Sequence, residues 1–186
     1  MEHPKGSTGI FNTLINPSRA IGMNHMDLKH LIHHFAAYDL WANTRVAERL
    51  SRESEAILDE PVRSSFPSLR STLMHVRNAE AAWFQRMSGI PQVWPAEPSE
   101  DLSTFLTHVR VMCDYARSLS SEELLASASY KDLKGNTHTT PRWQALMHCF
   151  NHATYHRGQL VTMMRALGLE DIPAMDLIVF QRLSAG

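Results

Sequence analysis

The sequence contains little cysteine and no long apolar run. Its 186 residues include only Cys113 and Cys149, too few for the disulfide framework of a small secreted domain. No stretch approaches the ~18 consecutive apolar residues that cross a bilayer, and no run of ~7 to 15 apolar residues follows Lys5 as in a secretory signal. We therefore expect a cytoplasmic protein that does not bind membranes.

The sequence also lacks an excess of charge of either sign. Eighteen Lys and Arg residues oppose 19 Asp and Glu residues, for a formal net charge of -1. This balance provides no field to attract a polyphosphate backbone, so we expect no binding to nucleic acid. The 44% hydrophobic and 20% charged residues are typical of one compact globular domain of this length.

Four stretches show the three-and-four spacing of apolar residues that is typical of helices with one buried face. These stretches span about 27–52, 68–89, 99–119 and 140–167. We predict an all-α fold, a four-helix bundle formed by residues 26–186, with a short hairpin-like or irregular segment at 126–140 before the last long helix. Residues 1–25 show no sustained period and are expected to form a flexible N-terminal arm, and the apolar tail 174–183 is expected to pack back on the bundle.

Polar and special residues mark the predicted helix ends. Ser68 and Ser99 are expected N-caps, because a serine hydroxyl accepts hydrogen bonds from the free amides of a first helical turn. Thr140 followed by Pro141 predicts the start of the last helix, because proline at the first helical position loses no useful N–H. Gly168 is expected to end that helix in the left-handed conformation.

The chain has eleven histidines, and three of them form a stripe on the last predicted helix. His148, His152 and His156 follow one another at intervals of four, so each ring lies about 6 Å along the axis from the last. Neighbouring members can share one metal ion, but His148 and His156 are about 12 Å apart along the axis and cannot. Such a site needs a third ligand from another helix, with a fourth position open to water or substrate.

The residues alone leave the choice of that third ligand open. The candidates on the other predicted helices are histidines: His30, His33, His34, His75 and His108. The first three crowd at a helix start and are typical of a solvated cluster, whereas His75 lies beside an apolar stripe. Cys149 is a rival, because thiolate is a good zinc ligand, although small buried cysteines are also common in cores.

The motifs of two other metal-enzyme classes are absent from the sequence. No Glu-x-x-His occurs on the predicted helices, and no acidic residue lies between Pro141 and Leu169, which argues against a di-iron oxygen centre. Ala153 follows His152 where a His-Glu-x-x-His peptidase has its general base, so peptidase activity is not expected either.

Three segments of the chain resemble the DinB family of metal-binding four-helix bundles. They are 151–168 with its His-x-x-x-His-Arg-Gly-Gln element, 73–87, and 38–50 with its Trp-Ala-Asn element. Carried across by position, the resemblance assigns the metal triad to His75, His152 and His156 and makes His148 a neighbour. It further implies a DinB-like bundle, a bound divalent metal ion, most often zinc or nickel, and a homodimer.

The resemblance also implies a function, because some related proteins are thiol S-transferases that act on bacillithiol and others are mycothiol-dependent isomerases. We therefore expect a metal-dependent thiol S-transferase-like enzyme, or a related hydrolase or isomerase, that binds a small-molecule thiol and an electrophile. Three neutral imidazoles leave the ion its full charge, so a bound thiol is expected to ionise. The alternatives are a non-catalytic protein with a structural or regulatory ion, and a helical interaction module that docks through the apolar tail.

Further residues are expected to contribute to such a site. Tyr38, Trp41 and Trp83 are candidates for the apolar walls of a substrate pocket, and Arg157 for the partner of an anion. Hydrogen bonds that orient ligand imidazoles are a usual requirement of metal sites, and the candidates for that role are Asn151 and Gln159.

Overall fold

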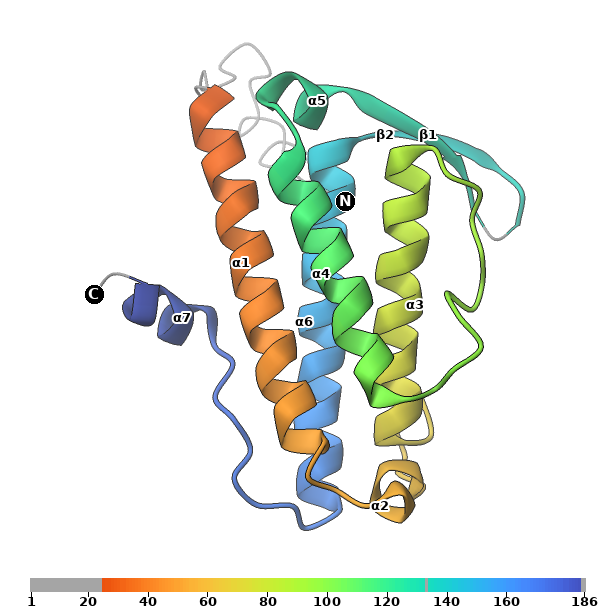
Figure 1. Cartoon of the computed structure of the whole chain (residues 1–186), viewed down its shortest axis with the longest axis vertical. Helices are drawn as coiled ribbons and strands as arrows, with labels where there is room; N and C mark the ends of the chain where they lie inside the picture. The colour runs from red at the N-terminus through yellow and green to blue at the C-terminus, as the bar shows by residue number, and fades with distance from the viewer. Residues whose placement is uncertain (1–24, 133, 185–186) are drawn as a thin grey trace, which may run out of the picture.

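The computed structural model describes residues 25–132 and 134–184, so the predicted N-terminal arm lies almost entirely outside the described residues. The helices and strands, in chain order, are α1 (His25–Leu50), α2 (Glu55–Asp59), α3 (Leu69–Ser88), α4 (Leu102–Ser118), α5 (Ser121–Leu125), β1 (Ser127–Lys131), β2 (Thr137–Pro141), α6 (Arg142–Ala166) and α7 (Leu177–Ser184). The long helices α1, α3, α4 and α6 lie side by side along the molecule (Figure 1).

The apolar faces of these four helices form one core. Ile32, Leu73, Phe105 and Leu160 are fully buried, one from each long helix. The strands β1 and β2 pair antiparallel at one end of the bundle, with Ser127 opposite Pro141 (Figure 1). The predicted all-α bundle with a short hairpin before the last long helix is thus confirmed.

Two predicted helix ends are correct. The Ser68 hydroxyl accepts a hydrogen bond from the Ser71 N–H, and the Ser71 hydroxyl accepts one from the Ser68 N–H, so the two serines cap α3 reciprocally. Gly168 has a φ of +70°, the left-handed conformation expected where α6 ends.

Two predicted N-caps are wrong. Asp101 rather than Ser99 caps α4, because its carboxylate accepts from the Ser103 N–H at 2.7 Å, while Ser99 accepts from the Asp101 N–H. Thr140 lies in β2, and the Arg142 N–H at the start of α6 donates to the Ala126 carbonyl. The hairpin therefore takes over part of the capping that a threonine side chain would provide.

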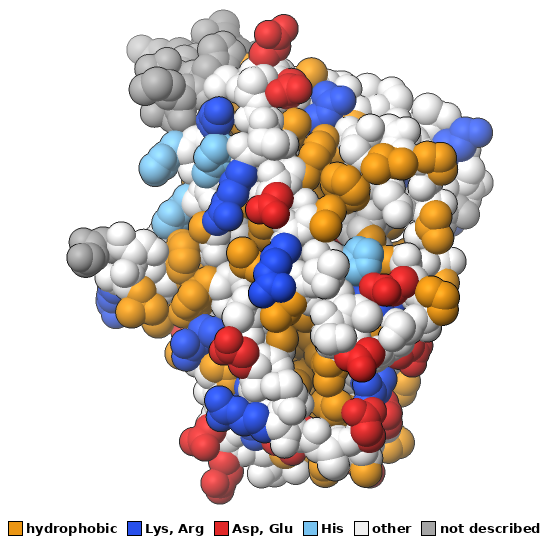
Figure 2. Space-filling model, viewed as in Figure 1, with side chains coloured by type: hydrophobic (Ala, Val, Ile, Leu, Met, Phe, Trp, Pro, Cys, Tyr) orange, Lys and Arg blue, Asp and Glu red, His pale blue; other side chains and the backbone are white. Residues whose placement is uncertain are grey.

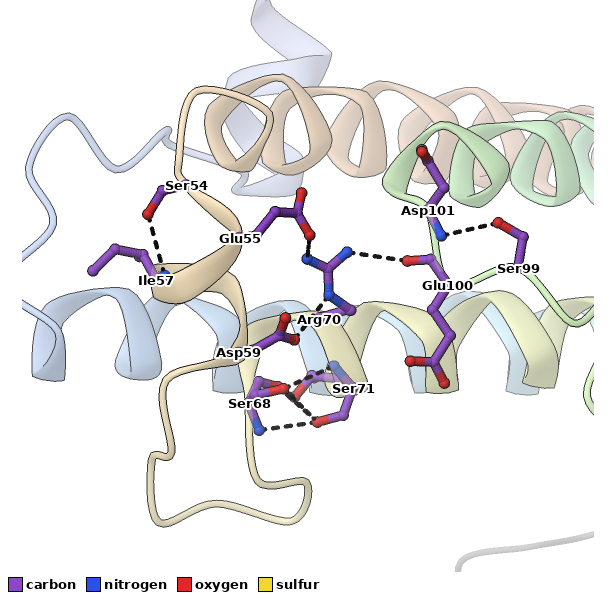
Figure 3. Close-up of polar contacts among 11 residues, drawn as sticks. Ser54, Glu55, Ile57, Asp59, Ser68, Arg70, Ser71, Ser99, Glu100 and Asp101 are labelled. Atoms are coloured by element: carbon purple, nitrogen blue, oxygen red, sulfur yellow. Dashed lines mark hydrogen bonds and ion pairs between the residues drawn. The ribbon is translucent and has the colours of Figure 1, made fainter.

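The short helix α2 lies in a connection where the sequence pattern predicted no helix, because five residues are too few to show a period. Figure 3 shows Arg70 between α2 and the start of α4. Its guanidinium donates to Asp59 at 2.8 Å, to Glu55, and to the Glu100 carbonyl at 3.1 Å. Arg70 thus joins three segments at this end of the bundle.

The C-terminal segment returns along α1, as expected for an apolar tail. Side chains of α1 donate to its backbone carbonyls: Tyr38 to Met175 at 2.8 Å, and Arg49 to Glu170 at 2.9 Å. The helix α7 then rests on α1 through Phe180, outside the four-helix core (Figure 1).

The surface mixes charges of both signs. On the face drawn in Figure 2, basic and acidic side chains are interspersed over the described residues and do not form a patch of one sign. Among the helices that the structure describes, none has the length and apolar character needed to cross a membrane.

A buried polar network joins α1, α3 and α6. Arg157 is only 3% exposed, and its guanidinium donates to Asp39 at 2.6 Å and to Asn43 at 3.0 Å. Glu80 lies against Asp39, but neither of its carboxyl oxygens receives a hydrogen bond from the described residues. Burial, and then the Asp39 charge, raise the pKa of Glu80 well above its ordinary value. We conclude that Glu80 is protonated and that Asp39 carries the charge that pairs with Arg157.

Replacing Glu80 with Gln is expected to stabilise the protein relative to wild type by an amount that grows with pH. The unfolded chain loses the Glu80 proton near pH 4.3, whereas the folded protein keeps it to higher pH, so the stability contributed by the protonated group is full below about 4.3 and is lost as the pH rises. Urea denaturation between about pH 5 and 8 should show the difference in unfolding free energy growing by up to about 1.4 kcal/mol per pH unit.

Glu122→Gln, at an exposed position of α5, is the matched control and should show no such growth. A constant difference between Glu80→Gln and wild type over this pH range would mean that Glu80 is ionised in the folded protein.

Candidate metal centre

Three histidine rings from α3 and α6 converge on one point. The Nε2 atom of His152 lies 3.2 Å from Nε2 of His75 and 3.1 Å from Nε2 of His156. The ligand nitrogens of all three residues lie within 4.8 Å of one another. A tetrahedral zinc ion with Zn–N bonds of about 2.05 Å separates its ligands by about 3.4 Å, so this arrangement can hold one metal ion.

A hydrogen bond to Gln159 sets the tautomer of one ring. Its side-chain oxygen lies 2.8 Å from Nδ1 of His156 and accepts that N–H, so the Nε2 lone pair of His156 points to the centre. The Gln159 amide in turn donates to the Ser65 hydroxyl at 2.7 Å. A single proton on Nε2 of His152 cannot satisfy both neighbouring nitrogens with good geometry, so a cation fits the donor set better than protons do.

The surroundings of all three imidazoles favour their neutral form. Burial first, and then the nearby histidines, lower the pKa of His75 and that of His152 to about 4. Burial also lowers the pKa of His156, against the opposing effect of its hydrogen bond to Gln159. Neutral rings are the form that binds metal, so protons compete weakly for this site at neutral pH.

The other ligand candidates lie elsewhere. Cys149 is buried in the core, and burial raises the pKa of its thiol well above the ordinary value, so it stays protonated. The His108 ring pairs with Glu97 at 2.9 Å, and His148 packs on Trp83 with ring centroids 5.0 Å apart. Within the described residues, no fourth histidine, cysteine or carboxylate joins the triad. The candidates His30, His33 and His34 all lie on α1, and the triad contains none of them.

Aromatic rings that were not predicted from the sequence surround the triad. Phe66 stacks on His75 with centroids 4.1 Å apart and an interplanar angle of 27°. The ring centroids of Trp94 and His75 are 6.3 Å apart, and those of Tyr155 and His156 are 5.1 Å apart. Both pairs meet edge-on. Phe66 and Trp94 lie in loops, where no periodic pattern marks them.

The residues expected to form a substrate pocket are divided between two places. Trp83 contacts His148, whose ring lies 5.9 Å from His152, so it borders the triad only indirectly. Tyr38 and Trp41 instead pack on Phe180 of α7, with centroids 5.9 and 5.6 Å away. The structure therefore does not bring Tyr38 and Trp41 to the triad.

Arg157 and Asn151 also differ from expectation. The Arg157 guanidinium donates hydrogen bonds to Asp39, Asn43 and Thr154. Together with Tyr38 it borders a separate cavity of about 630 Å³ between α6 and residues 172–177. Asn151 is exposed and makes no hydrogen bond to the triad in the part of the chain that the structure describes. Of the two predicted orienting residues, only Gln159 reaches a triad ring.

Comparisons with known proteins find relatives in one family. The model of the DinB family matches residues 23–184. The protein DinB of Bacillus subtilis (strain 168) is 28% identical over 148 residues, which are 73% of this chain and 86% of that protein. A crystal structure of a DinB-like protein from Bacillus cereus ATCC 10987 superposes with a TM-score of 0.53 at 18% identity, covering 72% of this chain and 90% of that one. The likeness to that structure concerns the fold.

The metal-free protein is expected to lose stability as the pH falls from about 6.5 to about 4. Across this window the unfolded state binds protons at His75 and His152 while the folded state, with pKa values of about 4, does not. The stability contributed by the lowered pKa values is therefore full above about pH 6.5 and is lost as the pH falls through the folded pKa. His152→Gln should make the pH dependence of the unfolding free energy shallower in urea denaturation with a chelator present.

His30→Gln, at an exposed histidine of α1, is the matched control and should keep the wild-type slope. Equal slopes for wild type and His152→Gln would show that His152 titrates alike in the folded and unfolded states.

Proposed function

The chain belongs to the DinB family, and from that premise we propose that it binds one divalent metal ion at His75, His152 and His156 and uses it for thiol S-transfer to a small electrophile. The observation that carries the proposal is the convergence of three Nε2 atoms. Nε2 of His152 lies 3.2 Å from that of His75 and 3.1 Å from that of His156. Some related proteins are thiol S-transferases, and this chain retains the histidine pattern on which that resemblance depends.

Zinc and nickel are the proposed ions, because imidazole nitrogen suits both. A divalent ion held by three neutral imidazoles keeps its full charge and acidifies a thiol that coordinates it. The absence of a fourth protein ligand among the described residues supports a position open to that thiol.

The protein's own residues orient and shield the site. Gln159 holds His156 in the tautomer that presents Nε2, and Phe66 covers one face of His75. His75 comes from α3 and the other two rings from α6, so a shift of α3 relative to α6 would disrupt the set. Such support is what keeps a metal site in its productive geometry.

A structural ion that only joins α3 to α6 is the competing interpretation, and a closed site completed by Cys149 would favour it. The buried, protonated Cys149 thiol packs in the core and is outside the group that converges on the triad, so this geometry supports the open site instead.

Purified protein is expected to contain about one divalent ion per chain, and His156→Ala is expected to remove it because two imidazoles bind far more weakly than three. Elemental analysis of the two proteins measures this, with circular dichroism to check that the bundle is folded. His148→Ala is the matched control, since it removes a histidine one turn from His152 that lies outside the triad, and it should keep the ion. Loss of the ion from both variants, or from neither, would contradict the assigned ligands.

A cobalt-substituted sample distinguishes an open site from a closed one. Adding a small thiol should produce a thiolate-to-cobalt charge-transfer band in the near ultraviolet, because the thiol enters the free coordination position. Cys149→Ala should give the same band, which excludes the protein's own thiol as its source. An unchanged spectrum on thiol addition would favour the structural ion.

A further inference from the structure

Two large aromatic side chains are exposed to solvent beside the triad. Trp94 is 51% exposed and Tyr155 is 62% exposed, and each meets a triad ring edge-on, His75 and His156 respectively. Covering exposed aromatic surface with a ligand is favourable because it removes apolar surface from water. The two rings therefore offer exposed apolar surface next to two of the three triad rings.

The position of Trp94 is fixed before any ligand binds. The loop that carries it is hydrogen-bonded to α3 on both sides: the Val93 N–H donates to Gln85 at 2.8 Å, and the Ala96 N–H donates to Asn78 at 3.1 Å. Because the backbone on each side of Trp94 is already held, little entropy is lost when a ligand contacts the ring.

Charged side chains near the triad are engaged elsewhere. Arg86 stacks on Trp83 and donates to Gln92, Glu97 pairs with His108, and the Arg157 guanidinium is buried against Asp39. Among the described residues, the hydrogen bonds of the triad rings are to one another and to the neutral Gln159. Apart from the ion itself, a charged group on a ligand would find no side chain of opposite charge at the triad to offset its desolvation.

We propose that this site selects a ligand whose metal-binding atom carries an uncharged aromatic or bulky apolar group that packs against the exposed rings of Trp94 and Tyr155. The inference rests on the proposed function and adds the substrate class, which is an apolar thiol. Trp94 and Tyr155 are then specificity-determining residues, distinct from the ligands.

The test compares thiols of different character on the cobalt-substituted protein. Phenylmethanethiol is the apolar probe, and 3-mercaptopropionate and 2-aminoethanethiol are the charged ones, with affinity measured from the charge-transfer band at fixed pH. Wild type should bind phenylmethanethiol at least about tenfold more tightly than either charged thiol, after correction for the thiol pKa values. An aromatic contact worth about 1 to 1.5 kcal/mol corresponds to about tenfold.

Trp94→Ala should lose about tenfold in affinity for phenylmethanethiol and little for the charged thiols, and Trp94→Phe should restore most of the loss. Trp41→Ala is the matched control, because it removes the same side chain from the α1 and α7 contact, and it should keep the wild-type preference. Metal content is measured for every variant, so that a change in preference is read only at equal occupancy.

The outcomes separate this inference from the proposed function. Full metal occupancy with a thiol-induced band, but equal affinity for apolar and charged thiols, overturns the inference and leaves the proposed function standing. The inference is overturned in the same way if Trp94→Ala and wild type show the same preference. A wild-type protein that binds no metal overturns the proposed function, and the inference fails with it.

Discussion

The packing of α3 against α6 is the constraint on which the site depends, because it brings nitrogen lone pairs from two helices to one point. Each helix alone presents too few ligands: α6 supplies an i,i+4 pair and α3 supplies a single ring. The lone pairs repel one another unless a proton or a cation lies between them, and their lowered pKa values show that burial disfavours the proton. The bundle core therefore provides the free energy that holds an otherwise unfavourable cluster together.

Adjacent residues of α6 serve different purposes because each step along a helix turns by about 100°. His156 faces α3 and the loop that carries Phe66, whereas Arg157 faces α1 and its buried carboxylate. The arginine beside His156 is thus part of the polar network in the core.

The loops on either side of α3 add residues to the site that the helices form. The segment before α3 places Phe66 and Ser65 against the triad and its hydrogen-bonded glutamine, and the segment after α3 returns along that helix to place Trp94 (Figure 1). Both loops are anchored to helices by side-chain amides, Gln159 for the first and Gln85 and Asn78 for the second. Rigid anchoring of this kind lets loop residues contribute to a site with little entropic cost on binding.

The sequence by itself determined the four long helices, the hairpin before the last one and the paired histidines of α6, because these follow from periodicity and from spacing within a single element. The residues alone did not choose His75 over His108 or Cys149, and only the resemblance did so before the structure. Which side chains meet across elements was decided by the tertiary structure: Phe66, Trp94 and Tyr155 at the triad, Asp101 at the start of α4, and Asp39 beside Arg157. Local patterns record the period of one helix, whereas such contacts depend on the rotation and offset between helices and on the paths of loops, which no local pattern encodes.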